Sequence, residues 1–230
     1  PAHTPVPEYI RLIAHGRFDD AYMINWKSNV FPGILGRTCD RPCEPACRRG
    51  RVEDEDLIES RKDPVAICRL KRVAADSKGN VSARMPKAPK ISNGRKIACL
   101  GAGPASLTVA RDLAVLGYEV TLFDQDPQLG GFMRTQIPHF RLPVEVIDEE
   151  MGYIMDVGNI NFVHKRIDSL KEVLNEGWDA IFVGTGAPRG RDLDIPGRKE
   201  AADNISIGID WLSSVSFGHI TSIGKRVIVL

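Results

Sequence analysis

The chain has 230 residues, of which 43% are hydrophobic and 27% are charged, so it is long enough for one large and one small domain with real cores. Its 31 basic and 30 acidic residues leave a net charge of +1, and no whole-chain charge favours nucleic acid or an anionic membrane as a partner. No apolar run approaches the length of a membrane span and no signal-peptide pattern is visible, which predicts a soluble, cytoplasmic protein.

The first 30 residues are expected to form two short helices. Pro7 and Glu8 suit a first helical turn, and Gly16 ends the run. A second run from Phe18 to Lys27 has apolar residues at helical spacing. Trp26, within it, is expected in the core.

A cysteine-rich loop follows, in which Cys39, Cys43 and Cys47 stand at every fourth position. Its prolines and glycines predict a loop with only short helical turns. Closely spaced thiolates on such a loop can converge on one inorganic centre, as in iron-sulfur ligation. Zinc stays the alternative, although it usually takes pairs of ligands with a second pair further along the chain. Five arginines flank the cysteines and are expected to offset the negative charge of thiolate-ligated clusters and raise their potentials: Arg37, Arg41, Arg48, Arg49 and Arg51.

An acidic run from Glu53 to Asp56 is most simply a solvated face. Asp63 and Pro64 mark an N-cap and first turn, so a helix carrying Cys68 is expected over residues 65–76. From Ser77 to Arg95 the composition shifts to Lys, Pro, Ser, Gly and Asn, which is typical of a linker or surface crossing. The sequence thus predicts a small helical domain over residues 1–80 and a linker over 81–95.

The stretch KIACLGAGPASLTVARDLAVLGYEVTLFD, residues 96–124, predicts a dinucleotide-binding unit. A buried strand leads into a turn through Gly101, Gly103 and Ser106, then an apolar helix that stops at Gly117 and a second strand that ends on Asp124. The glycines allow a tight turn and close approach to a pyrophosphate, while the acid can bind an adenosine ribose. The alternative is a glycine-rich turn in an α/β domain that binds nothing.

Beyond this unit, the sequence predicts helices over 144–157 and 170–175 and strands over 160–164 and 179–184. The pair Gly130-Gly131 lets a backbone approach a bulky group closely. Arg141 is either a partner for a pyrophosphate or flavin edge or a surface cation. Residues 223–230 end in GKRVIVL, which is similar to GRKIACLG at the first predicted strand, and they are expected to form the first strand of a second dinucleotide fold. Together with the start at Pro1, this ending suggests that the sequence is an internal piece of a longer protein.

Four motifs together resemble one family, the small subunit of glutamate synthase and its relatives, including the N-terminal half of dihydropyrimidine dehydrogenase. They are GRTCDRPCEPAC followed by DPVAICRLKRVAAD, GAGPASLTVARDLAVLGYEVTLFD, GGFMRTQIPHFRLP and AIFVGTGAPRGRDLDIPG. The resemblance covers essentially the whole chain. It implies an N-terminal α-helical domain with two [4Fe-4S] clusters, a Rossmann-like FAD domain over residues 96–222, and an NAD(P)H domain inserted into the latter.

The resemblance also implies the site residues. Cys39 and Cys43 would ligate one cluster and Cys47 the other, and the metal-ligand set is completed in this chain by Cys68. FAD would contact the following residues: Gly101, Gly103, Pro104, Ala105, Asp124, Gln125, Gly131, Arg141, Thr185 and Gly186.

The chain departs from the family pattern at several positions. The family has an upstream cysteine motif that would end just before Pro1, and its first two loop cysteines are further apart than here. Lys71 and Arg72 occupy the region of a non-cysteine ligand found in some members, and Cys68, a turn earlier, is the replacement expected. Gln136 stands where many members have glycine beside the isoalloxazine.

The function expected from these observations is electron transfer. NAD(P)H in the full-length protein would reduce FAD, and single electrons would pass through the clusters to a partner subunit in a hetero-oligomer, with no nucleic acid or membrane partner and no acid-base residue needed. Two alternatives stay open: a non-catalytic assembly module with a structural metal, and the front end of an electron-bifurcating ferredoxin reductase.

Overall fold

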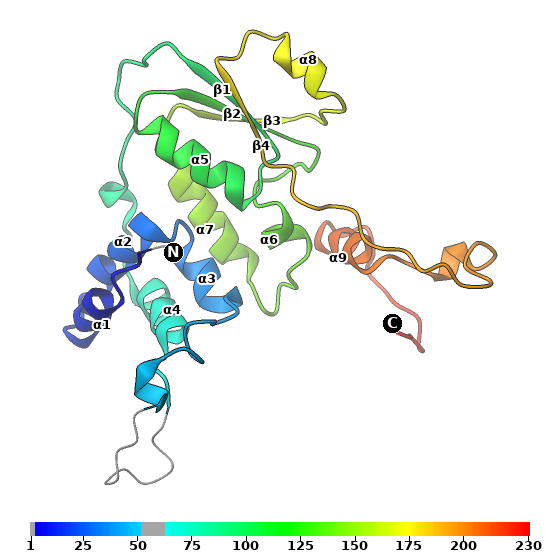
Figure 1. The fold of residues 1–230 in the computed structure, drawn as a ribbon, viewed down its shortest axis with the longest axis horizontal. Helices are drawn as coiled ribbons and strands as arrows, with labels where there is room; N and C mark the ends of the chain where they lie inside the picture. The colour runs from blue at the N-terminus through cyan, green and yellow to red at the C-terminus, as the bar shows by residue number, and fades with distance from the viewer. Residues whose placement is uncertain (1–2, 52–62) are drawn as a thin grey trace. The chain divides into compact units, whose positions relative to one another are not determined.

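A computed structural model describes residues 3–51 and 63–230, so the acidic run at 53–56 lies outside the described part of the chain. The chain divides into two compact units, Pro1–Met85 and Pro86–Leu230, and Figure 1 shows that the first is helical whereas the second is built on a sheet. No helix within the described ranges is long and apolar enough to cross a membrane.

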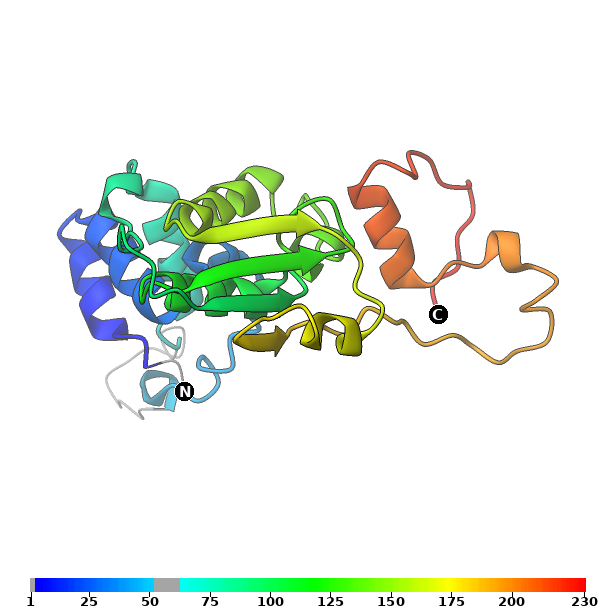
Figure 2. The same cartoon turned by 90° about the horizontal axis from the view of Figure 1, so that it is seen from above.

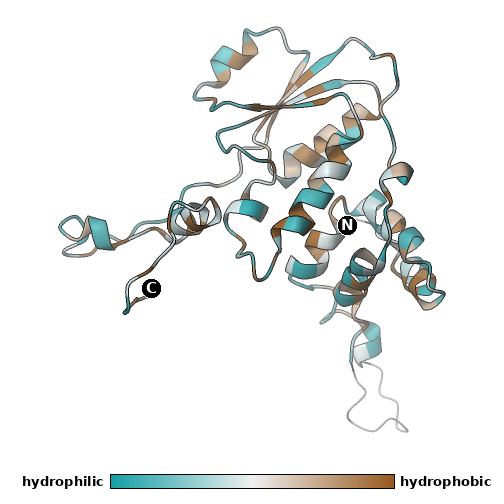
Figure 3. Cartoon of the chain, turned by 180° about the vertical axis from the view of Figure 1, so that it is seen from behind, coloured by the Kyte–Doolittle hydropathy of each residue, from teal (hydrophilic) through white to brown (hydrophobic). Residues whose placement is uncertain are grey.

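The described residues of the first unit form four α-helices and two short 3-10 turns. The bounds are α1 (Val6–Ala14), α2 (Phe18–Ser28), α3 (Pro32–Thr38), η1 (Arg48–Arg51), α4 (Ile67–Ser77) and η3 (Ser82–Arg84). Its core is formed by Tyr9, Leu12, Ala21 and Ala74. In Figure 3 these helices carry both apolar and polar residues, as expected for helices that bury one side.

One local detail differs from the expectation, and a second was not predicted. Helix α4 begins at Ile67 with Ala66 at its N-cap position and no side-chain cap, so Asp63 does not cap it. Helix α3 is packed closely against α4, because a Cβ on Gly36 would lie 2.8 Å from the Cα and N atoms of Arg72. The glycine therefore permits the two backbones to approach.

The expected linker over residues 81–95 is not a free segment. Val81 is fully buried and Met85 is 3% exposed. The next residues pack within the second unit, where the Ala88 N–H donates to the Val157 carbonyl at 2.7 Å and the Asn93 N–H donates to the Gly117 carbonyl at 2.9 Å. Their polar composition therefore reflects a surface path that is fixed by backbone hydrogen bonds.

The second unit contains a parallel four-stranded sheet with the order β3-β2-β1-β4. The strands are β1 (Lys96–Leu100), β2 (Glu119–Asp124), β3 (Ile160–His164) and β4 (Ala180–Val183). Helices α5 (Pro104–Ala114) and α7 (Val144–Met155) lie on one side of the sheet and α8 (Leu170–Leu174) on the other (Figures 1 and 2). This is the doubly wound arrangement that the sequence predicts.

Strand β1 is the centre of this sheet. Its last residue, Leu100, is paired with Phe123 on β2 and with Val183 on β4. The chain moves from β1 to one side for β2 and β3 and to the other side for β4. The carboxyl ends of β1 and β4 therefore flank a topological switch point, where ligands of such folds bind.

The C-terminal part differs most from the expectation. Helix α9 (Gly208–Ser216), which the sequence reading missed, contacts α6 (Phe132–Thr135). No strand forms over 223–230, and Ile228 and Val229 are 86% and 90% exposed. A strand is stable only when a neighbouring strand pairs with its backbone groups, and no segment described here does so. The first strand of a second dinucleotide fold therefore stays a prediction.

Candidate functional site

A cleft of about 550 Å³ lies at the carboxyl ends of the strands. Its walls are the turn after β1, the end of β2, the Gly130-Gly131 turn with α6, the residues after β3 and the residues after β4. Nine of the ten residues that the sequence assigns to a dinucleotide line it: Gly101, Gly103, Pro104, Ala105, Asp124, Gln125, Gly131, Thr185 and Gly186. Gln136 lines it as well.

The floor of the cleft is made by two glycine turns in close contact. Gly131 has a φ of 52°, and a Cβ on it would lie 2.7 Å from the Cα of Gly103. The Gly130 N–H donates to the Ala102 carbonyl at 3.0 Å. A side chain at Gly131 would separate the turns, so this glycine allows them to form a cradle for a bulky, closely bound group.

The start of α5 points into this cradle. Pro104 is at the first helical position, and the following backbone amides have no partners within the helix, so they can bind an anion at its N-terminus. Ser106 takes the third place of the glycine motif and is fully buried. It packs against Gly184, at the end of β4, where its hydroxyl takes the space that a Cβ would need.

Asp124 positions the first turn. One carboxylate oxygen accepts the Ala102 N–H at 2.6 Å, and the other accepts the Asp126 N–H at 2.9 Å. Each oxygen retains a further lone pair for a ligand hydroxyl. Asp126 also lines the cleft, and its pKa is raised by burial and by the neighbouring Asp124 carboxylate.

Arg141 lies outside the set of residues that line the cleft and is exposed. Conversely, the sequence reading missed Lys165, Arg166 and Ile167, which line the cleft directly after β3. The predicted strand over residues 160–164 could have indicated them, because the carboxyl ends of parallel strands meet at one edge of a sheet and the residues that follow each strand lie there. The unit thus has the polar groups, glycine turns and volume that fit a dinucleotide.

The second group of candidate residues lies in the helical unit. Cys39, Cys43 and Cys47 are half-buried free thiols, and Cys68 is a buried one. The Sγ atom of Cys68 lies 3.4 Å from the Gly36 carbonyl oxygen and 3.5 Å from that of Leu35, to which the thiol donates. Burial raises the pKa of Cys68, Cys39 raises it further, and Arg41 acts in the opposite direction.

The other thiols have different surroundings. The pKa of Cys47 is lowered mainly by backbone N–H groups, that of Val65 first and that of Arg49 next. Cys43 and Cys68 both lie close enough to Tyr9 to raise its pKa, although burial is the larger cause. Soft sulfur donors with cations beside them have the chemistry of an iron-sulfur site.

Across residues 3–51 and 63–230, no three Cys, His, Asp or Glu side chains converge as a ready-made metal site. The donor chemistry fits iron-sulfur ligation, while the complete ligand set of either centre is not assembled by the described residues.

Comparisons with known proteins match both units. Residues 1–82 match the family model of dihydropyrimidine dehydrogenase domain II, 4Fe-4S cluster. Residues 99–175 match the NAD(P)-binding Rossmann-like domain.

Three similar proteins each align with the whole chain. The NADP(+)-dependent formate dehydrogenase subunit beta of Moorella thermoacetica is 31% identical, and the chain covers 34% of its length. The NADPH-Fe(3+) oxidoreductase subunit beta of Geobacter sulfurreducens is 34% identical, also with 34% of its length covered. The glutamate synthase [NADPH] small chain of Azospirillum brasilense is 31% identical, with 49% of its length covered. The chain thus spans between a third and a half of the length of these relatives.

The fold and the two sites define a protein with an N-terminal [4Fe-4S] domain followed by a Rossmann-like dinucleotide-binding domain. The chain matches the family model of dihydropyrimidine dehydrogenase domain II in its first 82 residues, and over its whole length it is similar to oxidoreductase subunits that include the glutamate synthase small chain. The resemblance stated from its motifs is confirmed.

Proposed function

We propose that this chain is the electron-transfer module of an NAD(P)H-dependent flavin and iron-sulfur oxidoreductase. The observation that carries the proposal is the presence of two kinds of site in one chain: a glycine-lined cleft at the switch point of a parallel sheet, and a loop with three thiols in a [4Fe-4S] domain. The relatives support it, because each is an oxidoreductase subunit whose name includes NADPH or NADP(+).

The cleft in the second unit is the proposed FAD site. When bound, FAD accepts a hydride and releases electrons singly. The α5 amides and the turn through Gly101 and Gly103 would hold its pyrophosphate, and Asp124 would accept hydrogen bonds from its ribose. Gly131, Thr185 and Gly186 would line the path toward the isoalloxazine. Arg141 stays a predicted contact, one that requires its segment to turn toward the cleft.

The thiols of the first unit are the proposed cluster ligands. Cys39 and Cys43 are assigned to one [4Fe-4S] centre and Cys47 to the other, with Cys68 as a further ligand. Ligation by Cys68 requires its thiol to lose the proton that it donates to the α3 carbonyls. The lowered pKa of Cys47 favours its thiolate form, which is the form that ligates iron.

We further infer a partner subunit that accepts or supplies the electrons, since the relatives are named as beta subunits or small chains. The domain bounds expected from the sequence and a cytoplasmic location stay predictions. A front end of an electron-bifurcating ferredoxin reductase would share both sites described here.

An absorption spectrum of the anaerobically purified full-length protein tests this function. Flavin bands with a broad shoulder from iron-sulfur charge transfer, both bleached by NADPH or NADH, are expected. A colourless protein with stoichiometric zinc would overturn the proposal in favour of an assembly module with a structural metal.

A further inference from the structure

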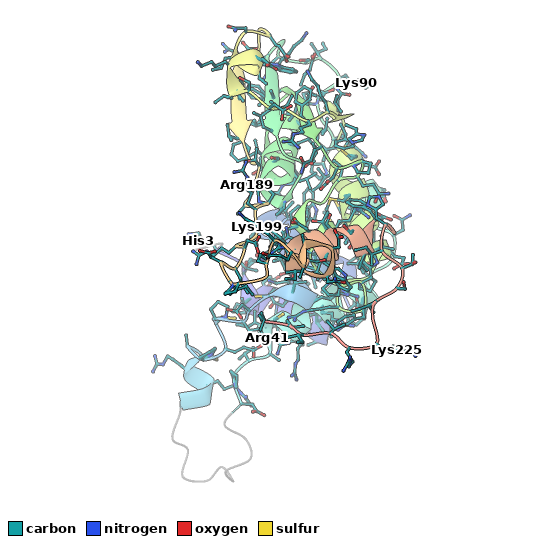
Figure 4. All side chains as sticks on the ribbon, turned by 90° about the vertical axis from the view of Figure 1, so that its right-hand side faces the viewer. His3, Arg41, Lys90, Arg189, Lys199 and Lys225 are labelled. Carbon is teal, nitrogen blue, oxygen red and sulfur yellow. The ribbon has the colours of Figure 1, made fainter. Side chains whose placement is uncertain are left out.

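Arg41, labelled in Figure 4, has an unusual backbone conformation in the cysteine loop. Its φ is 58°, in the left-handed region that residues other than glycine seldom adopt. Pro42 follows it, and a residue before proline is further restricted to extended conformations. Such a conformation persists only where surrounding contacts hold it, and an observed outlier of this kind is a reason to look for a function.

The contacts of Arg41 are with two candidate ligands. Its backbone N–H donates to the Sγ atom of Cys39 at 3.4 Å. Its side chain lies within hydrogen-bonding reach of the Cys68 sulfur. One residue therefore directs two donors of different kinds at two sulfur atoms that come from separate parts of the chain.

The neighbouring arginines are engaged elsewhere. The Arg37 guanidinium donates to the Gly33 carbonyl at 3.1 Å and to the Asp76 carboxylate at 2.6 Å. Arg49 donates to the carbonyl oxygen of Asp63. Lys71 is a second cation that acts on Cys68, and it is 7% exposed on α4. The guanidinium groups of Arg37 and Arg49 therefore donate to backbone and carboxylate oxygens, whereas the backbone N–H of Arg41 donates to the Cys39 sulfur.

We propose that Arg41 is a positioning residue that donates hydrogen bonds to the thiolate ligands of a [4Fe-4S] centre and raises its reduction potential. The inference rests on the proposed function. Reduction adds negative charge to the sulfur ligands, and hydrogen bonds and a cation beside them stabilise the reduced state more than the oxidised state. The left-handed backbone at Arg41 occurs together with the hydrogen bond from its N–H to the Cys39 sulfur.

Three substitutions in the full-length protein separate charge, side chain and backbone. Arg41→Gly removes the side chain and suits the positive φ, Arg41→Ala removes the side chain in the strained backbone, and Arg41→Lys retains a charge. Arg48→Ala, at an exposed arginine of the same loop, is the matched control. The measurements are iron content and the midpoint potential of each cluster, followed by electron paramagnetic resonance in a redox titration.

We expect Arg41→Gly and Arg41→Ala to shift the one-electron equilibrium of one cluster about tenfold toward oxidation, which is about 59 mV. Arg41→Lys should shift it less and Arg48→Ala not at all. Loss of iron from Arg41→Gly but not from Arg48→Ala would also support the positioning role. Full iron content and unchanged potentials in the Gly and Ala variants would overturn this inference alone, whereas an iron-free wild type would overturn the proposed function with it.

Discussion

The carboxylate of Asp124 accepts hydrogen bonds from two backbone N–H groups, that of Ala102 in the glycine turn and that of Asp126 beyond its own strand. The sequence predicted a ribose-binding acid here from its distance to the glycine motif. It did not predict that the same side chain orients the turn. The carboxylate therefore has a structural task in addition to the proposed contact with the ligand, and its removal should affect both.

We expect Asp124→Ala to weaken FAD binding by roughly ten- to a hundredfold, because a charge-assisted hydrogen bond contributes about 1.5 to 3 kcal/mol. Asp124→Glu should retain most of the affinity, since it preserves the carboxylate. Flavin released on gel filtration and fluorescence titration measure the effect. Asp156→Ala, at an exposed acid after α7, is the control, and equal occupancy in wild type and Asp124→Ala would count against the assignment.

The two roles considered for Cys68 require different protonation states of its sulfur. As a thiol it donates to the carbonyls at the end of α3, and burial raises its pKa. As the proposed ligand it must be a thiolate. From the sequence, Cys68 was expected only to replace the ligand that some family members have in the region of Lys71 and Arg72. Its burial and its hydrogen bonds to the α3 carbonyls could not be predicted from residue spacing.

If Cys68 ligates iron, both Cys68→Ser and Cys68→Ala should lose iron and the electron paramagnetic resonance signal of one cluster. If it is a core thiol, Cys68→Ser should keep full iron content, since serine can still donate to the same carbonyls, and only thermal stability should fall. Cys99→Ala, at a fully buried cysteine of β1, controls for the loss of a buried sulfur. Unchanged iron in both Cys68 variants would remove this residue from the ligand set.

At the scale of elements, the cleft depends on loops that follow four different strands. The segment from β1 to β2 matched its expected bounds closely, because buried strands, glycine turns and an apolar helix are local patterns. The place of Arg141 and the cleft residues after β3 were not predictable in the same way. They depend on how distant segments meet at one edge of the sheet, which no local pattern specifies.

The contact between the two glycine turns can be tested by a single methyl group. Gly131→Ala places a Cβ near Gly103 and adopts a positive φ, so we expect a loss of about 1 to 3 kcal/mol in stability and a marked loss of bound FAD. Chemical denaturation and flavin content provide the measurement.

Gly152→Ala is the matched control for this change. Gly152 lies in α7 with open space at its Cβ position, and alanine there should stabilise the helix by about 0.5 to 1 kcal/mol. A Gly131→Ala protein as stable and as flavin-loaded as wild type would show that the turns have room to separate.

At the scale of the whole molecule, the two units have separate hydrophobic cores. One is formed by Tyr9, Leu12 and their neighbours, and the other by Leu100, Phe123 and their neighbours. The composition change after residue 77 indicated this division, although Val81 and Met85 are buried where a linker was expected. Each proposed cofactor has its ligands within one unit, so each should stabilise mainly that unit.

Hydrogen exchange of the full-length protein, with peptide resolution, tests this separation. FAD at one hundred times its dissociation constant stabilises the state that binds it by about 2.7 kcal/mol, so exchange in β1, α5 and β2 should slow whereas exchange in α1, α2 and α4 stays unchanged. Removal of iron by a chelator should accelerate exchange in α1, α2 and α4 alone. Asp124→Ala is the control that should lose the response to FAD, and equal changes in both sets of elements on either treatment would show that the units unfold together.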